Sequence, residues 1–93
     1  MVRRESVYFG VRQGGVDTFY FDQQETERIA YMSGEVQVVT GIMAGLVDGM
    51  TMGVVSASAG ILSRKARRCL SRGKCLKIEL YGLIVVPREY EPD

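Results

Sequence analysis

Alternating apolar and polar positions run through the first part of the chain and predict antiparallel strands. A glycine pair at 14–15 separates two such stretches, and adjacent glycines can take the positive φ values of a tight hairpin turn. Counting outward from this turn places Arg12 opposite Asp17 and Gly10 opposite Phe19. Because this register faces opposite charges and packs an aromatic ring beside a glycine, we expect it for the first hairpin.

The next stretch, 26–39, also alternates, on both sides of the dipeptide Ser33-Gly34. Its apolar positions share one face and most of its polar positions share the other, as in a half-buried sheet. We therefore expect a second hairpin here. A helix over 24–32 is the alternative, because the charged residues in that stretch are compatible with helical structure.

The stretch 36–63 carries a single charge, Asp48, and allows two interpretations. Glycines recur at every fourth position over 41–53 and would form a smooth ridge on a helix, as in closely packed membrane helices. However, the stretch is rich in β-branched residues, and Asp48-Gly49 between apolar runs is a strong hairpin signal. An aspartate at mid-span also costs about 2.5–3.5 kcal/mol of insertion free energy, whereas each Leu, Ile or Val returns about 0.3–0.6 kcal/mol. We therefore expect a third hairpin, with a membrane helix over 36–62 as the alternative.

Both faces of this third hairpin would be apolar, which predicts self-association. One helix can cover one face of so small a sheet, and the other face then needs a second layer or another molecule. We expect a homo-oligomer with two-fold or ring symmetry. The residues expected to form its contact face are Ile42, Ala44, Leu46, Thr51 and Val55.

The clearest helix signal covers 61–72, where apolar residues recur at helical spacing on one side and cations occupy the other. Gly73 suits the left-handed residue that ends many helices. A strand is expected over 75–86, ending before Pro87, and an acidic tail over 88–93 is expected to be mobile.

These elements predict a single small domain over 1–93 of the α+β class. We expect mainly an antiparallel β meander of about six strands, with one basic amphipathic helix near 60–72 before the last strand.

Charge is concentrated in one segment. Residues 1–63 carry four Lys or Arg against seven Asp or Glu, 64–77 carry seven basic residues and no acid, and 78–93 carry one basic residue against four acids. The net charge of +1 therefore conceals a basic segment whose local field can attract anions. Nucleic acid is the first partner that we expect, through phosphate contacts, and the alternative is a solvated or internally paired face. The residues expected to bind are Arg64, Lys65, Arg67, Arg68, Arg72 and Lys74.

Histidine and cysteine, two residue types that often carry catalysis or bind metals, are absent or few in this chain. The chain has no histidine, and Cys69 and Cys75 alone cannot supply the four ligands of a structural metal site. We therefore expect no enzymatic activity and no cofactor. With two cysteines and no apolar stretch after the charged first residues, we expect free thiols and a cytoplasmic or virion location.

The function expected from the sequence is that of a non-enzymatic binding or assembly protein, which self-associates and presents a basic helix to an anionic partner. A virion structural subunit or an accessory regulator of a phage or plasmid would fit. The alternatives are a small membrane protein that oligomerises through the glycine ridge, and an adaptor or inhibitor that docks on a larger protein.

Overall fold

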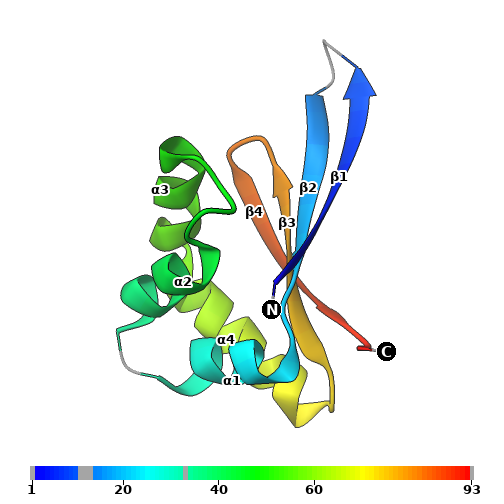
Figure 1. The fold of residues 1–93 in the computed structure, drawn as a ribbon. Coiled ribbons are helices and arrows are strands. Elements are labelled where there is room, and N and C mark those ends of the chain that lie inside the picture. Colours follow the sequence, from blue (N-terminus) through cyan, green and yellow to red (C-terminus); the bar gives the residue numbers. More distant parts are fainter. Residues whose placement is uncertain (1, 11–13, 33, 93) are drawn as a thin grey trace.

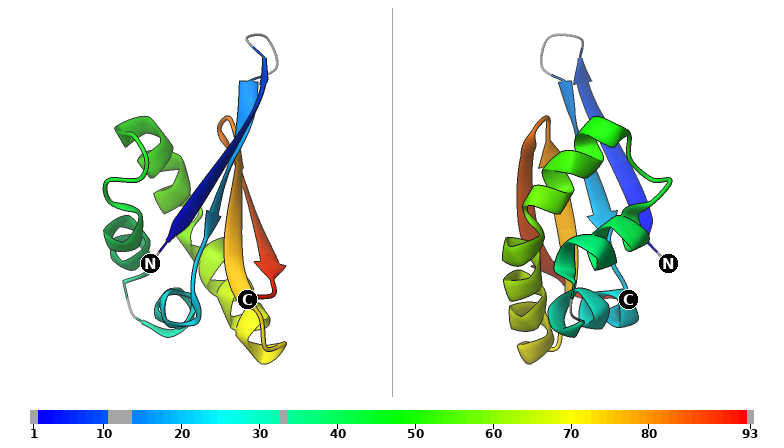
Figure 2. Two further views of the ribbon diagram at one scale, coloured as in Figure 1. Left: turned by 45° about the vertical axis from the view of Figure 1, so that its right-hand side comes forward. Right: turned by 90° about the vertical axis from the view of Figure 1, so that its left-hand side faces the viewer.

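The computed structural model describes residues 2–10, 14–32 and 34–92, which form a four-stranded antiparallel sheet with four helices on one of its faces (Figures 1 and 2). The strand order is β1-β2-β3-β4, so each strand lies beside its neighbour in the sequence. The elements in chain order are β1 (Arg3–Gly10), β2 (Gly14–Tyr20), α1 (Gln23–Tyr31), α2 (Glu35–Met43), α3 (Gly49–Ala57), α4 (Ala59–Ser71), β3 (Cys75–Tyr81) and β4 (Ile84–Tyr90).

The α+β class predicted from the sequence is confirmed, but the prediction of about six strands and one helix is wrong. The second and third predicted hairpins are replaced by α1, α2 and α3. The prediction of one strand over 75–86 is also wrong. The chain reverses at Gly82, whose φ is +63°, and β3 and β4 pair with each other across this turn. A glycine with positive φ at the first central position is typical of a two-residue hairpin turn.

The first three residues of the predicted mobile tail over 88–93 are part of the sheet, since β4 continues through Tyr90. Arg88 is paired in register with Lys77, and Tyr90 with Cys75. The Tyr90 hydroxyl donates a hydrogen bond to the carbonyl oxygen of Phe21, which ties the end of β4 to the segment that follows β2.

The first hairpin forms, but in a different register from the predicted one. Asp17 is paired with Ser6, and Arg4 with Phe19. Asp17 accepts a hydrogen bond from Arg4 at 3.3 Å, whereas Arg12, its predicted partner, lies outside the described residues. Gly15 is not a turn centre but part of β2, where it allows the close approach of β1. A Cβ at this position would lie 2.5 Å from the carbonyl oxygen of Val7.

Replacing Gly15 with alanine should therefore force β1 away from β2 and lower the free energy of unfolding by about 1–3 kcal/mol, the usual range for overpacked sites. The matched control is Gly53→Ala in α3, where an added Cβ meets no atom within 4 Å. Alanine is favoured over glycine inside a helix by about 0.8–1.0 kcal/mol, so this control should raise stability. Urea unfolding followed by circular dichroism measures both changes, and a destabilised Gly53→Ala variant would argue against helix at that position.

The helix α1 begins with a capping box at Asp22 and Glu25. The Asp22 carboxylate accepts a hydrogen bond from the Glu25 amide at 2.8 Å, and the Glu25 carboxylate accepts one from the Asp22 amide at 3.1 Å. This reciprocal pair satisfies two backbone donors that the first turn of a helix leaves open. The second predicted hairpin, over 26–39, is therefore wrong, and the helical alternative for 24–32 is confirmed.

The dipeptide Asp48-Gly49 starts a helix instead of turning a hairpin. The Asp48 side chain accepts a hydrogen bond from the Thr51 amide at 2.8 Å, which caps α3. Between α2 and α3 the chain changes direction in a short connection in which Gly45 has a φ of +81°. The apolar middle of the chain thus forms two short helices, and not one continuous helix over 36–62. None of the helices in the described part of the chain is long and apolar enough to cross a bilayer.

Replacing Asp48 with alanine should remove this cap and lower the free energy of unfolding by about 1 kcal/mol. The Asp48→Ser variant keeps a side-chain oxygen that can accept the same amide hydrogen, so its stability should remain within a few tenths of a kcal/mol of the wild type. Chemical denaturation of the two variants side by side provides the measurement. Equal losses in both variants would show that the cap contributes little.

The core lies between the helices and the covered face of the sheet. From the sheet it takes Phe19, Leu76, Ile78 and Leu80, all at most 4% exposed. From the helices it takes Ile29, Ala30, Val38, Val39, Met43, Val55, Ala59, Leu62, Ala66 and Cys69. Because Val38 and Val39 of α2 and Val55 of α3 reach this core, burial outweighs their preference for strands.

Candidate nucleic-acid interface

The helix α4 agrees closely with the helix predicted over 61–72. Its inner side buries Leu62, Ala66 and Cys69, at spacings of four and three residues, and these side chains pack into the core. The positive φ of Gly73, +69°, confirms the predicted left-handed stop. Because one side is fixed against the core, the basic residues are held on the outer side of α4.

The six predicted binding residues fall into two groups. Arg72 and Lys74, at the end of α4 and just beyond it, both form ion pairs with Glu89 of β4, at 3.1 and 3.7 Å. The other group forms no ion pair with any acid in the described part of the chain. We call this second group the unpaired quartet, and its members are Arg64, Lys65, Arg67 and Arg68.

The unpaired quartet is exposed and concentrated within five residues of α4. Arg64, Arg67 and Arg68 are exposed, and Lys65 is half-buried. Residues three or four positions apart are neighbours on a helix surface, so Arg64 lies beside Arg67 and Arg68 and repels both. Each such like-charge pair costs about 0.2–0.5 kcal/mol, and no acid in the first turn of α4 offsets the cost. The structure therefore retains a charge arrangement that its own stability does not require.

A hollow of about 230 Å³ lies where the quartet borders β4. Arg64, Lys65 and Arg68 line it together with two apolar residues, Ile61 and Pro87. Pro87 is paired in register with the buried Ile78, so it lies on the same face of the sheet as α4. Among the residues that the structure describes, no acidic one lines this hollow.

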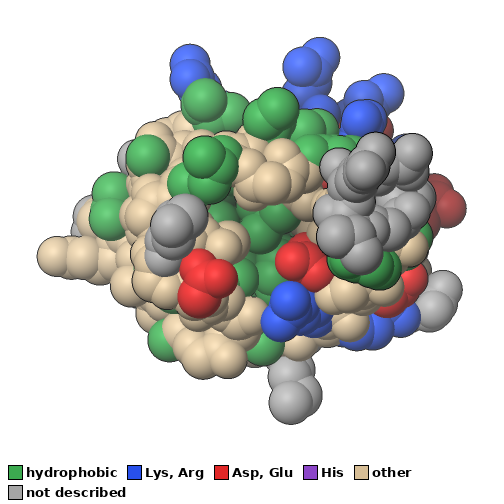
Figure 3. Space-filling model, turned by 90° about the horizontal axis from the view of Figure 1, so that it is seen from above, with side chains coloured by type: hydrophobic (Ala, Val, Ile, Leu, Met, Phe, Trp, Pro, Cys, Tyr) green, Lys and Arg blue, Asp and Glu red, His purple; other side chains and the backbone are tan. Residues whose placement is uncertain are grey.

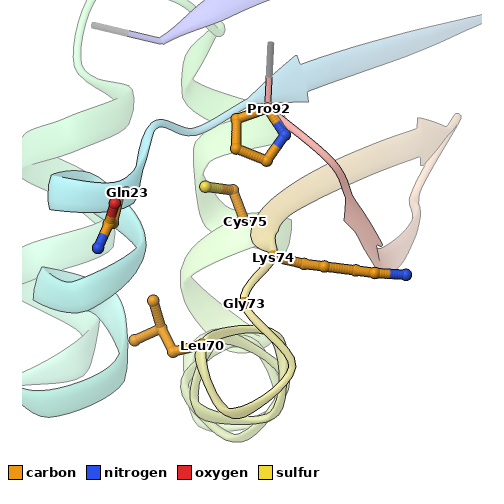
Figure 4. A pocket seen from close by; sticks show the side chains of 6 residues that line it. All are labelled: Gln23, Leu70, Gly73, Lys74, Cys75 and Pro92. Atoms are coloured by element: carbon orange, nitrogen blue, oxygen red, sulfur yellow. The ribbon is translucent and has the colours of Figure 1, made fainter.

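A second hollow, of about 260 Å³, lies beyond the end of α4 and is lined by Gln23, Leu70, Gly73, Lys74, Cys75 and Pro92 (Figure 4). Figure 4 shows the side chain of Lys74 directed away from the other lining side chains, and Lys74 is already paired with Glu89. Burial raises the pKa of the Cys75 thiol, and it also raises the pKa of Cys69. Both thiols therefore stay protonated near neutral pH and lack the reactivity of a nucleophilic cysteine.

Metal binding has no support in the described part of the chain, where no group of three or more Cys, Asp or Glu side chains could hold an ion. This finding concerns side chains that could bind a metal ion. It does not test the expected absence of a cofactor, which stays a prediction.

The five residues predicted for self-association do not form the sheet surface from which they were predicted, because the third hairpin is absent. Val55 is fully buried inside the molecule, and Ile42 and Leu46 are partly buried against its core. Only Ala44 among the five is exposed, and Thr51 is intermediate. Self-association itself stays a prediction, but these five residues do not form a common surface that could mediate it.

The sequence did not reveal the uncovered face of the sheet, which the helices leave open (Figure 2). Val7, Val16, Tyr81 and Ile84 are paired in register across all four strands and form an apolar row there. Ile84 is 64% exposed and Val7 is 52% exposed. In the sequence, Leu76, Ile78 and Leu80 alternate with Lys77, Glu79 and Tyr81, which was a signal that Tyr81 lies on the opposite face. Which face would be covered depends on helices that were not predicted.

One end of the molecule, where α3 and the β1–β2 hairpin project in Figure 1, is shown in Figure 3. Hydrophobic side chains gather on this surface and line a hollow, with side chains of both charge signs at its border (Figure 3). Because the charges there are mixed, this end of the molecule does not offer an anion the uniform field that the unpaired quartet offers.

No protein-family model matches this chain, and no curated protein or solved structure shows significant similarity to it.

Proposed function

We propose that this protein is a non-catalytic binding protein that uses the outer side of α4 to bind the phosphate backbone of nucleic acid. The observation that carries the proposal is the unpaired quartet: four cations within five residues, of which none has an acidic partner among the described residues. Cations that are already paired must break an ion pair before they can bind a phosphate, whereas the quartet can bind without that cost. Each phosphate contact releases condensed counterions and adds to the affinity.

Binding of this kind should show little preference for base sequence. The helix α4 contains no Asn or Gln, the residues that most commonly read adenine, and arginines at phosphates position a protein without reading bases. We therefore expect oligonucleotides of unrelated sequence to bind with similar affinity at the same salt concentration.

The test is a fluorescence-anisotropy titration of labelled duplex and single-stranded oligonucleotides with the full chain over a range of salt concentrations. If the whole quartet contacts phosphates, the logarithm of the affinity should fall linearly with the logarithm of salt, with a slope of about 3–4. Two unrelated sequences should give the same line. Failure to bind either form at low salt would refute the proposal.

A further inference from the structure

The hollow between α4 and β4 differs from the rest of the basic surface because three basic residues line the same space. Arg64, Lys65 and Arg68 all line it, while Arg67 does not. Arg72, the residue that caps the end of α4, is bound to Glu89 at 3.1 Å. The helix and its cap thus carry two arginines at the hollow and two arginines away from it, although the sequence alone gives all four the same role.

The walls of the hollow suit a ligand that only accepts hydrogen bonds. Pro87 lines the hollow beside the arginine side chains and presents its apolar ring there. Proline has no backbone N–H, so all the charged hydrogen-bond donors at the hollow come from the basic side chains. Ile61, which is 53% exposed, supplies a second apolar wall from α4 itself. Arginine guanidinium groups are planar forks that match two oxygen atoms of a phosphate, and Lys65 adds a third cation at the same place.

The size of the hollow limits what can occupy it. Its volume of about 230 Å³ is smaller than the roughly 300–1,000 Å³ of sites that enclose a whole small molecule or cofactor. A phosphate group with part of its attached sugar is smaller than a whole small molecule or cofactor. Its charged oxygens match the basic side chains of the hollow, and its sugar carbons match the apolar walls.

We infer that this hollow binds one backbone phosphate of a nucleic acid strand, with the adjoining sugar packed against Ile61 and Pro87. The inference rests on the proposed function and narrows it, because it assigns unequal roles to arginines of the same helix. Arg64 and Arg68 hold the phosphate directly, and Arg67 adds only a general attraction from outside the hollow.

The test compares two double variants that each remove two positive charges from α4 and its C-terminal cap. Arg64→Gln with Arg68→Gln removes the cations of the hollow, and Arg67→Gln with Arg72→Gln leaves the hollow intact. Affinity for one short oligonucleotide is measured for both across salt, after circular dichroism has shown that both variants are folded. The hollow pair should lose at least about tenfold more affinity than the outer pair, and its salt slope should fall by about 0.9, the value for one lost phosphate contact.

A third variant, Ile61→Ala, removes an apolar wall without changing charge. It should weaken binding about threefold at every salt concentration and leave the salt slope unchanged, because apolar contact is insensitive to ionic strength. An unchanged affinity in this variant would contradict the sugar contact.

The outcomes separate the inference from the proposal on which it rests. Equal losses in the two double variants would overturn the phosphate site in the hollow and leave binding by α4 intact. No loss in either variant would refute both. A parallel titration with vesicles of anionic phospholipid offers the same phosphate chemistry from a membrane, and arginine-dependent binding to vesicles but not to oligonucleotides would overturn the inference.

Discussion

Replacing Phe19 with alanine should lower the free energy of unfolding by about 3–5 kcal/mol, the range for removing a buried aromatic side chain. Phe19 is fully buried and is paired with Ile78 in β3 on one side and with Arg4 in β1 on the other. The Arg4 guanidinium carbon lies 5.7 Å from the centre of its ring. The phenyl ring therefore joins three strands to the helix layer, and its loss leaves a cavity at their junction.

A loss of this size is a large fraction of the total stability, since a chain of 93 residues is expected to have about 5–14 kcal/mol. The matched control is Tyr31→Ala, which truncates an aromatic side chain that is 68% exposed at the end of α1. Its stability should stay within about 0.5 kcal/mol of the wild type. Urea unfolding of both variants provides the comparison, and similar losses would show that Phe19 does not occupy the core.

Replacing all four members of the unpaired quartet with glutamine should nearly abolish nucleic-acid binding without lowering stability. The salt slope should fall by about 0.9 for each phosphate contact that the quartet makes. Stability should be unchanged or slightly higher, because three like-charge pairs on α4 disappear, each worth about 0.2–0.5 kcal/mol. A surface that served only the fold would not show this combination of lost binding and retained stability.

The control for this variant removes the same charge elsewhere, by changing Arg3, Arg28, Lys77 and Arg88 to glutamine. These four residues lie outside α4, so the change removes the same net charge without touching the quartet. Arg3 and Arg88 form ion pairs with Glu5 and Glu79, and thermal unfolding therefore checks that the control remains folded. Anisotropy titrations and thermal unfolding are run on both proteins. If the control loses as much affinity as the quartet variant, binding reflects the overall charge of the protein and not the arrangement on α4.

The parts of the structure that follow from local signals could be predicted from the sequence. The helix over 61–72 was found because its apolar spacing, its cationic side and the glycine at 73 all lie within one short stretch. The helix α1 also has a local signal that was missed, since Asp22 followed three residues later by Glu25 is a capping box.

The middle of the chain was mispredicted because one dipeptide supports two structures. Asp48-Gly49 is typical of a hairpin turn, and aspartate is equally typical of the first capping position of a helix. The choice between them depends on which surface Val38, Val39 and Val55 can reach. Those valines are buried in the core that the helices form together with the sheet, and this core joins residues far apart in the sequence.

The candidate site shows the same division between local and distant signals. The concentration of cations over 64–77 was visible in the sequence, but the pairing of Arg72 and Lys74 with Glu89 was not. That pairing depends on β4 returning beside the end of α4. The hollow could not be predicted either, since Pro87 reaches α4 only through the same return.

The central claim is that the outer side of α4 contacts nucleic acid, and an NMR titration of isotope-labelled protein with a short oligonucleotide tests it most directly. We expect the largest chemical-shift changes along α4 and at Pro87's neighbours in β4, with the guanidinium signals of Arg64 and Arg68 moving most. The shifts should reverse when salt is added. Changes confined to the uncovered face of the sheet, around Val7 and Ile84, would contradict the claim.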